Sequence, residues 1–493
     1  MIFSSVYFIF FFFPLVYFIY FILCKKSKLY SCIWLIISSF LFYSFLSFKS
    51  LIFLILSIFV NFYISIFFDI FIKQKKKLLI FGITFNIAFL IFFKYSNFLL
   101  DIISFLHQIR PKDLDLISLV GISFFTFTQI SFLVDRYNNK FEEKNIFYYV
   151  LFVSFFPYVI SGPVVNYLES MKNFLKRKSF SIRIADIERG LFFFTMGISK
   201  KILLADPLGS FSNKLFSINE FNAIPTFIFS WLAVVANTLR LYFDFSGYSD
   251  MALGLACFFG MKIPFNFNSP LKARSIIDFW SGWHMSLTNY FIKYLYTPIS
   301  LTMSRLSYNQ NSLIQNLFSF IFPTIITFLI IGFWHGPSWA FAIFGLLHAL
   351  LIIINRLWRI IYKKKIFIIF HIFFNRFYCF ITFVVISLSL VIFTTESVNS
   401  SLLIYKSLFN INYLFSNYYS PVFFIENFNS ILLTLVALVI ALFVPNTIQL
   451  SQKIKSPPLT KNYFYTFYLS LVFFLSLLGI LSHQSQNFIY FKF

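Results

Sequence analysis

Long apolar runs separated by short polar stretches dominate the chain. Most runs approach the roughly 20 residues that an α-helix needs to cross the hydrocarbon core of a bilayer. They centre near residues 14, 38, 61, 89, 125, 197, 234, 323, 348, 380, 440 and 473. The pattern therefore predicts an all-α protein that crosses a membrane many times.

Two stretches break this pattern. Residues 147–165 are apolar, but they contain Pro157 and the pair Gly162-Pro163, which interrupt a helix, and basic clusters lie on both sides. Residues 244–300 mix charges with aromatic side chains and are too polar to span lipid. We expect the first stretch to be re-entrant or interfacial and the second to form a half-buried shelf facing the cytoplasm. Broken backbone at depth requires protein or a watery cavity around it, so a cavity is also expected.

Composition supports a membrane protein and argues against nucleic-acid binding. The chain is 59% hydrophobic and 12% charged, against about 25% charged residues in soluble proteins. We interpret residues 1–493 as a single integral-membrane domain. The formal charge of +23 comes from Lys and Arg clusters between the apolar runs, which is typical of cytoplasmic loops. The four cysteines show no paired spacing, so neither a disulfide framework nor a metal site is expected.

Two histidines beside tryptophans are the main candidates for chemistry. His335 follows Trp334 in a polar break between two apolar runs, where Gly336-Pro337 ends the helix. A neutral imidazole titrates near pH 6.5 and can accept a proton from a hydroxyl. His284 follows Trp283, and it is either part of the reaction path or a structural histidine at an interface.

Charged residues near residue 244 form a second candidate group. Arg240, Asp244 and Asp250 follow an apolar run, and ionisable groups in a membrane usually face a cavity or a partner. The alternative is a structural Arg240–Asp244 pair that closes a helix end. For His348 we expect a role in helix packing, and for the remaining histidines no catalytic role: His107, His371 and His483.

An ordered set of motifs resembles the membrane-bound O-acyltransferase (MBOAT) family. The resemblance is greatest to the bacterial branch that includes alginate O-acetylase and the D-alanyl-lipoteichoic acid transferase. It runs nearly end to end, and the order of the segments makes it specific, whereas Trp-His-Gly alone is a weak signal. The matching segments lie at residues 121–135, 155–164, 197–206, 242–251, 264–270, 274–286, 294–298, 332–339 and 488–493.

The resemblance implies a ring of about 11–13 transmembrane helices around a funnel or tunnel, with a catalytic core at about residues 115–360. It implies that His335 is the catalytic general base and His284 the second catalytic histidine. Residues expected to bind substrate or support the site are Arg240, Asp244, Asp250, Trp283, Trp334, Asn268 and Arg274.

The resemblance also implies a bacterial inner-membrane enzyme. It would transfer an acyl group, most simply acetyl, from a cytoplasmic thioester such as acetyl-CoA, with no bound cofactor or metal. The acceptor would be a glycan hydroxyl, reached directly or through a periplasmic SGNH-type partner, and the lipid bilayer would be the surrounding medium.

Several positions depart from the family pattern. Ser281-Gly282 stands where Arg-Arg is common, and Ile292-Lys293 stands where Arg-Asp is common, which puts donor recognition in doubt. Two other functions stay open: a transporter or flippase of lipid-linked glycans, and D-alanyl transfer to teichoic acid. The charge rule also places His335 toward the outside, so a cytoplasmic donor would have to reach it through a tunnel.

Overall fold

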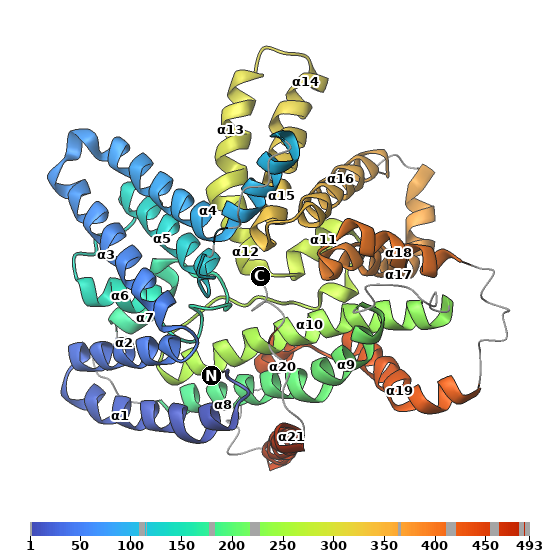
Figure 1. The fold of residues 1–493 in the computed structure, drawn as a ribbon, viewed down its shortest axis with the longest axis horizontal. Coiled ribbons are helices and arrows are strands. Elements are labelled where there is room, and N and C mark those ends of the chain that lie inside the picture. The colour runs from blue at the N-terminus through green and yellow to red at the C-terminus, as the bar shows by residue number, and fades with distance from the viewer. Residues whose placement is uncertain are drawn as a thin grey trace. The chain divides into compact units, whose positions relative to one another are not determined.

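A computed structural model describes residues 2–107, 114, 116–176, 183–216, 227–362, 366–410, 421–453, 463–482 and 488. Within these ranges every regular element is a helix, as predicted (Figure 1). The chain forms two compact units that alternate along the sequence. Unit 1 comprises Met1–Ser199, Gly247–Phe265 and Ser451–Lys492, and unit 2 comprises Lys200–Ser246, Asn266–Leu450 and Phe493.

Unit 1 contains the N-terminal helices, α8 and the last long helix of the described chain. α21 packs against α8, and α4 packs against α5. The elements are η1 (Phe8–Phe12), α1 (Phe13–Lys26), α2 (Lys28–Ser44), α3 (Phe48–Ile70), η2 (Ile72–Gln74), α4 (Lys75–His107), α5 (Ile122–Tyr137), α6 (Ile146–Ser154), α7 (Tyr167–Lys176), α8 (Ile184–Ser199) and α21 (Tyr463–Ser482).

Unit 2 contains both predicted histidines, together with Arg240 and Asp244. Helix α10 (Phe227–Phe258) contributes residues to both units. Helix α20 (Thr447–Lys453) likewise contributes residues to both units. The other elements of unit 2 are η3 (Lys200–Ala205), α9 (Asp206–Phe216), η4 (Pro270–Lys272), α11 (Ile276–Gly282), α12 (Met285–Phe291), η5 (Ile292–Tyr296), α13 (Thr297–Leu306), α14 (Ser312–Asn316), η6 (Leu317–Ile321), α15 (Phe322–His335), α16 (Trp339–Tyr362), α17 (Ile366–Thr395), α18 (Val398–Phe409) and α19 (Pro421–Phe443).

Eight helical stretches of the described chain are long and apolar enough to cross a membrane. Eight of the twelve predicted centres fall in them, and the other four, near residues 38, 125, 197 and 234, fall in α2, α5, α8 and α10. The chain is therefore a multi-pass membrane protein. The eight stretches are Phe8–Lys26, Phe48–Ile70, Ile72–His107, Ser312–His335, Trp339–Arg359, Phe377–Thr395, Ile425–Phe443 and Tyr463–Ser482.

The predicted break at residues 147–165 is confirmed. α6 has nine residues, or about 14 Å at 1.5 Å per residue, which is well short of the ~30 Å hydrocarbon core. Hydrogen bonds inside the protein satisfy part of the broken backbone: Val159 N–H donates to the Phe155 carbonyl, and Phe156 N–H donates to Ser39 Oγ, both at 3.1 Å. Gly121 has a φ of 67°, and a Cβ there would lie 2.7 Å from the Val159 carbonyl oxygen.

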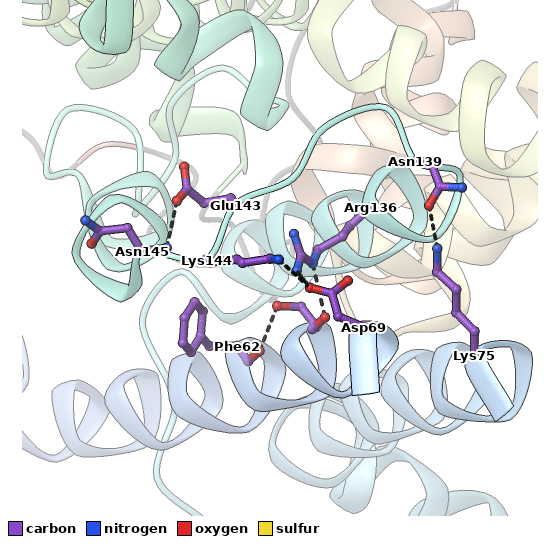
Figure 2. A network of polar contacts seen from close by, with 9 residues as sticks. Phe62, Asp69, Lys75, Arg136, Asn139, Glu143, Lys144 and Asn145 are labelled. Atoms are coloured by element: carbon purple, nitrogen blue, oxygen red, sulfur yellow. Dashed lines mark hydrogen bonds and ion pairs between the residues drawn. The ribbon is translucent and has the colours of Figure 1, made fainter. Parts of the chain in front are cut away.

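A polar cluster joins α3 to the end of α5 in unit 1 (Figure 2). The Asp69 carboxylate accepts from Arg136 at 2.9 Å and lies 3.6 Å from Nζ of Lys144. Arg136 also donates from Nε to the Ser65 carbonyl at 3.1 Å. Because the Arg136 side chain is almost fully buried, these bonds hold the C-terminal end of α5 against α3.

The helix pair α15–α16 is the frame of the candidate site in unit 2 (Figure 1). A three-residue connection, residues 336–338, joins the two helices. They approach closely through two glycines: a Cβ on Gly332 would lie 2.3 Å from the Phe341 carbonyl oxygen, and one on Gly345 would lie 2.3 Å from that of Phe328. Small residues let helix backbones touch in this way inside membranes.

The first part of residues 244–300 continues α10 as far as Phe258, and the part that follows α10 is built from short elements. It runs through an irregular segment at residues 261–269 and then through η4, α11, α12 and η5. Two backbone hydrogen bonds pair this irregular segment with the α11–α12 junction: Asn268 N–H to the Gly282 carbonyl and Met285 N–H to the Asn266 carbonyl, both at 2.9 Å. These bonds place the histidine of the junction.

Candidate functional site

His335 is the last residue of α15, and Gly336 follows it in an extended conformation. The helix therefore ends at the imidazole, as the Gly336-Pro337 sequence predicts. The side chain is buried at 4% exposure. This places a titratable ring inside the protein at the end of a membrane-spanning helix.

Aromatic rings surround the His335 imidazole. Its centroid lies 4.7 Å from Trp334 and 4.8 Å from Phe393, both edge to face, and 6.2 Å from both Phe341 and Phe344. All four rings are themselves buried. We call these four residues the aromatic box.

His284 lies between α11 and α12 in a left-handed conformation with a φ of 44°. A left-handed conformation is uncommon for a residue other than glycine and is worth relating to function. Its Nδ1 lies 2.9 Å from Oδ1 of Asn266, and Nε2 has no hydrogen-bond partner among the described residues. Burial lowers the pKa of His284 to about 3, so its imidazole is neutral at pH 7.

Trp334 connects the two histidines. Its ring centroid is 5.9 Å from that of His284 and 4.7 Å from that of His335. Phe245 of α10 also packs edge to face on His284, and the two ring centroids lie 4.6 Å apart. Two segments that lie about fifty residues apart in the sequence thus meet through one indole, and the structure brings both predicted histidines into one region of unit 2.

A buried ion cluster joins α10, the helix of Phe245, to η3 and α9. Nζ of Lys201 contacts Asp206 at 2.8 Å and Asp244 at 2.9 Å, and all three side chains are buried or nearly so. Arg240 donates to Asn213 Oδ1 at 2.6 Å. The sequence singled out Arg240 and Asp244 but missed Lys201 and Asp206 as their partners, although Lys201 stands in one of the family-like motifs.

The other predicted site residues lie in different surroundings. Trp283 is buried, stacks on Phe279 at 5.4 Å and meets Phe267 edge to face at 5.1 Å. Asn268 is exposed and accepts from Nδ2 of Asn446 at 2.8 Å, and Arg274 is exposed. Asp250 is buried on the part of α10 that belongs to unit 1.

His348 is held at both ring nitrogens. Trp280 Nε1–H donates to Nδ1 at 3.2 Å, and Nε2 lies 3.2 Å from Ser389 Oγ. An accepting Nδ1 carries no proton, so Nε2 is the protonated nitrogen and donates to Ser389. These bonds fit the packing role predicted for His348. His107 is exposed at the end of α4, whereas the His371 side chain and His483 lie outside the described residues.

This arrangement can support acid–base chemistry without a metal. The described residues hold no group of three or more His, Cys, Asp or Glu side chains that could bind a metal ion. They do hold two buried histidines on either side of an indole, one of which presents a bare ring nitrogen. That nitrogen is Nε2 of His284 and can accept a hydrogen bond, whereas His335 is the candidate that can accept a proton from an attacking hydroxyl.

Comparisons with known proteins identify the family of this chain. The family model described as "MBOAT, membrane-bound O-acyltransferase family" matches residues 137–404, a range that includes both histidines, the aromatic box and the ion cluster. The chain is 34% identical to the peptidoglycan O-acetyltransferase of Helicobacter pylori, over 84% of this chain and 80% of that protein.

Two further relatives come from the same group of proteins. A protein named probable alginate O-acetylase AlgI from Pseudomonas aeruginosa is 33% identical over 69% of this chain and 61% of that protein. The teichoic acid D-alanyltransferase of Bacillus subtilis is 28% identical over 48% of this chain and 58% of that protein. The chain therefore belongs to the membrane-bound O-acyltransferase family and is an O-acyltransferase.

Proposed function

We propose that this protein transfers an acetyl group from a cytoplasmic thioester, such as acetyl-CoA, to a hydroxyl of a cell-envelope polysaccharide. We further propose that it does so in the inner membrane of a bacterium. The observation that carries the proposal is the placement of His335 at the end of a membrane-spanning helix, inside the aromatic box and one indole away from His284.

His335 is the general base in this proposal. Its neutral imidazole takes the proton of the acceptor hydroxyl while the oxygen attacks the thioester carbonyl. A C–O bond forms, the C–S bond breaks, and the thiolate leaves and takes up the proton that the imidazole held. An activated thioester needs no covalent enzyme intermediate, so a single general base suffices for the transfer.

Peptidoglycan is the acceptor that we propose to test first. The H. pylori peptidoglycan O-acetyltransferase is 34% identical over 84% of this chain, whereas the probable alginate O-acetylase of Pseudomonas syringae is 29% identical over 83%. The acetyl group reaches the glycan either directly or through a periplasmic SGNH-type partner. Both routes require the thioester to enter from the cytoplasmic side and the acyl group to leave on the other side.

The experiment measures acetyl transfer in inside-out membrane vesicles supplied with labelled acetyl-CoA and, separately, base-labile acetate on the cell-wall glycan of intact cells. His335→Ala should reduce both by about 10²-fold or more, because general-base catalysis contributes about 10²–10⁴-fold. His107→Ala is the matched control: this histidine is exposed on α4, and its loss should leave both readouts unchanged.

Three outcomes would contradict the proposal. Full acetyl transfer by the His335→Ala variant would show that His335 is not the general base. Transfer that needs an acyl carrier protein charged with D-alanine, and fails with acetyl-CoA, would place the enzyme with the teichoic acid D-alanyltransferases. Normal movement of lipid-linked glycan by the protein, unaffected by His335→Ala, would indicate a flippase.

A further inference from the structure

Asn266 has a place at the site that its sequence motif did not reveal. It lies on the irregular segment at residues 261–269, it is 1% exposed, and its carbonyl accepts from Met285 N–H at 2.9 Å. Its side-chain oxygen, Oδ1, faces His284 Nδ1 at 2.9 Å, Ser286 Oγ at 2.8 Å and Ser286 N–H at 3.3 Å. One amide oxygen thus gathers three groups from the start of α12.

The Ser286 backbone fixes which way the Asn266 amide points. A backbone N–H can only donate, so the side-chain atom that faces it must be the oxygen and not the NH₂ group. The same oxygen faces His284 Nδ1, and an amide oxygen can only accept. Nδ1 of His284 therefore carries the proton.

The tautomer of His284 follows. A neutral imidazole has one N–H, and burial lowers the pKa of His284 to about 3, which keeps the ring neutral. With the proton on Nδ1, Nε2 holds a lone pair, and this nitrogen has no hydrogen-bond partner among the described residues. A buried acceptor without a partner costs free energy unless a group of a bound ligand donates a hydrogen bond to it.

Neighbouring charges leave this assignment undisturbed. The rings packed on His284 belong to Phe245 of α10 and Trp334 of α15, and neither is charged. Asp244, next to Phe245, is paired with Lys201. Burial is the cause of the low pKa of His284, and no charged neighbour contributes to it.

We propose that Asn266 is a positioning residue that locks His284 as the Nδ1–H tautomer, so that Nε2 accepts a hydrogen bond from an N–H or O–H group of the bound substrate. His284 is then an acceptor in the reaction and not a donor to the acyl carbonyl. The proposal rests on the acyltransferase function proposed above. The donor group belongs either to the glycan hydroxyl or to an amide of the thioester arm.

The test uses paired substitutions in the full-length protein. Asn266→Asp keeps an acceptor beside Nδ1, and Asn266→Leu removes it at similar size. The acid limb is the fall in acetyl transfer as the pH is lowered. In Asn266→Asp, the carboxylate favours the imidazolium and raises the His284 pKa, so activity falls at a higher pH than in the wild type. In Asn266→Leu, the tautomer is no longer fixed, and transfer should fall by about 10-fold or more at every pH.

His284 itself provides a second pair. Glutamine places its amide oxygen near the position of Nε2, whereas asparagine replaces only Nδ1, so His284→Gln should retain more activity than His284→Asn. The substrate whose KM rises in His284→Asn identifies the donor group: acetyl-CoA points to the thioester arm, and the glycan points to its hydroxyl. Asn145→Asp, at the N-cap of α6 in unit 1, is the control that should leave the acid limb unchanged.

The outcomes separate this proposal from the function on which it rests. Activity in His335→Ala would overturn the function. An inactive His335→Ala together with a wild-type acid limb in Asn266→Asp would overturn the role of Asn266 alone. The same conclusion follows if His284→Asn is more active than His284→Gln. Thermal unfolding in detergent shows which variants are folded, and the acid limb of a folded Asn266→Asp decides the question.

Discussion

The indole N–H of Trp280 donates to Nδ1 of His348 at 3.2 Å, and this buried bond joins α11 to α16. His348 passes the connection on to Ser389 of α17, so three helices meet at one imidazole. The same ring packs 4.4 Å from Phe344 of the aromatic box. A histidine away from the proposed reaction thus supports one wall of the site.

Trp280→Phe should destabilise the protein without changing its pH profile. The substitution leaves the buried Nδ1 of His348 without its donor, and hydrogen bonds between membrane helices contribute about 1 kcal/mol. We expect the apparent Tm in detergent to fall by a few degrees, while the pH at half-maximal transfer stays that of the wild type. A shifted acid limb would show that His348 takes part in proton transfer.

Lys201→Met should be far more damaging than the loss of an exposed ion pair. It removes the cation shared by the carboxylates of Asp206 and Asp244, and breaking a buried pair costs about 3–5 kcal/mol. The control is Arg359→Ala. Arg359 bonds Asp278 at the same 2.9 Å distance with both side chains about half exposed, so its loss should cost less than about 1 kcal/mol. Equal shifts in apparent Tm would contradict this comparison.

Gly345→Ala should separate α15 from α16. The new Cβ would lie 2.3 Å from the Phe328 carbonyl oxygen, a backbone atom that cannot move without the helix. We expect a large loss of folded protein, measured by size-exclusion chromatography, and loss of acetyl transfer. Gly82→Ala is the matched control: its Cβ would meet the end of the Leu133 side chain at 2.7 Å, which can turn aside.

The membrane topology can be tested with single cysteines. In a background without the four native cysteines, Lys172→Cys should react with an impermeant thiol reagent only from the cytoplasm, and Lys49→Cys only from outside. Both positions are exposed. Labelling of residue 172 from outside would mean that residues 147–165 cross the membrane completely and that the loop assignments after them are inverted.

The helical architecture and its main break could be predicted from the sequence because each depends on local chemistry. Run length and hydropathy determine where helices form, and Pro157 and Gly162 determine where one must stop. The resemblance to a known family selected His335 and His284. Both histidines lie in the range that the family model matches, residues 137–404.

The partners of these residues could not be predicted, because they come from tertiary packing. Asp244 of α10 also contacts Lys201, which belongs to η3 and not to α10. Asn266 was passed over for Asn268 because the residues between α10 and η4 follow no regular period, so nothing in the sequence says which of the two faces inward.

The aromatic box also bears on a competing reaction. Water is a nucleophile that can attack any thioester, and an enzyme that let it reach the acyl carbon would hydrolyse its donor and acetylate nothing. The rings of Trp334, Phe341, Phe344 and Phe393 offer water few hydrogen-bonding partners beside His335. Replacing one of them with a small polar residue should therefore raise the ratio of free acetate to acetylated glycan. The rate at which donor is consumed should change less than this ratio.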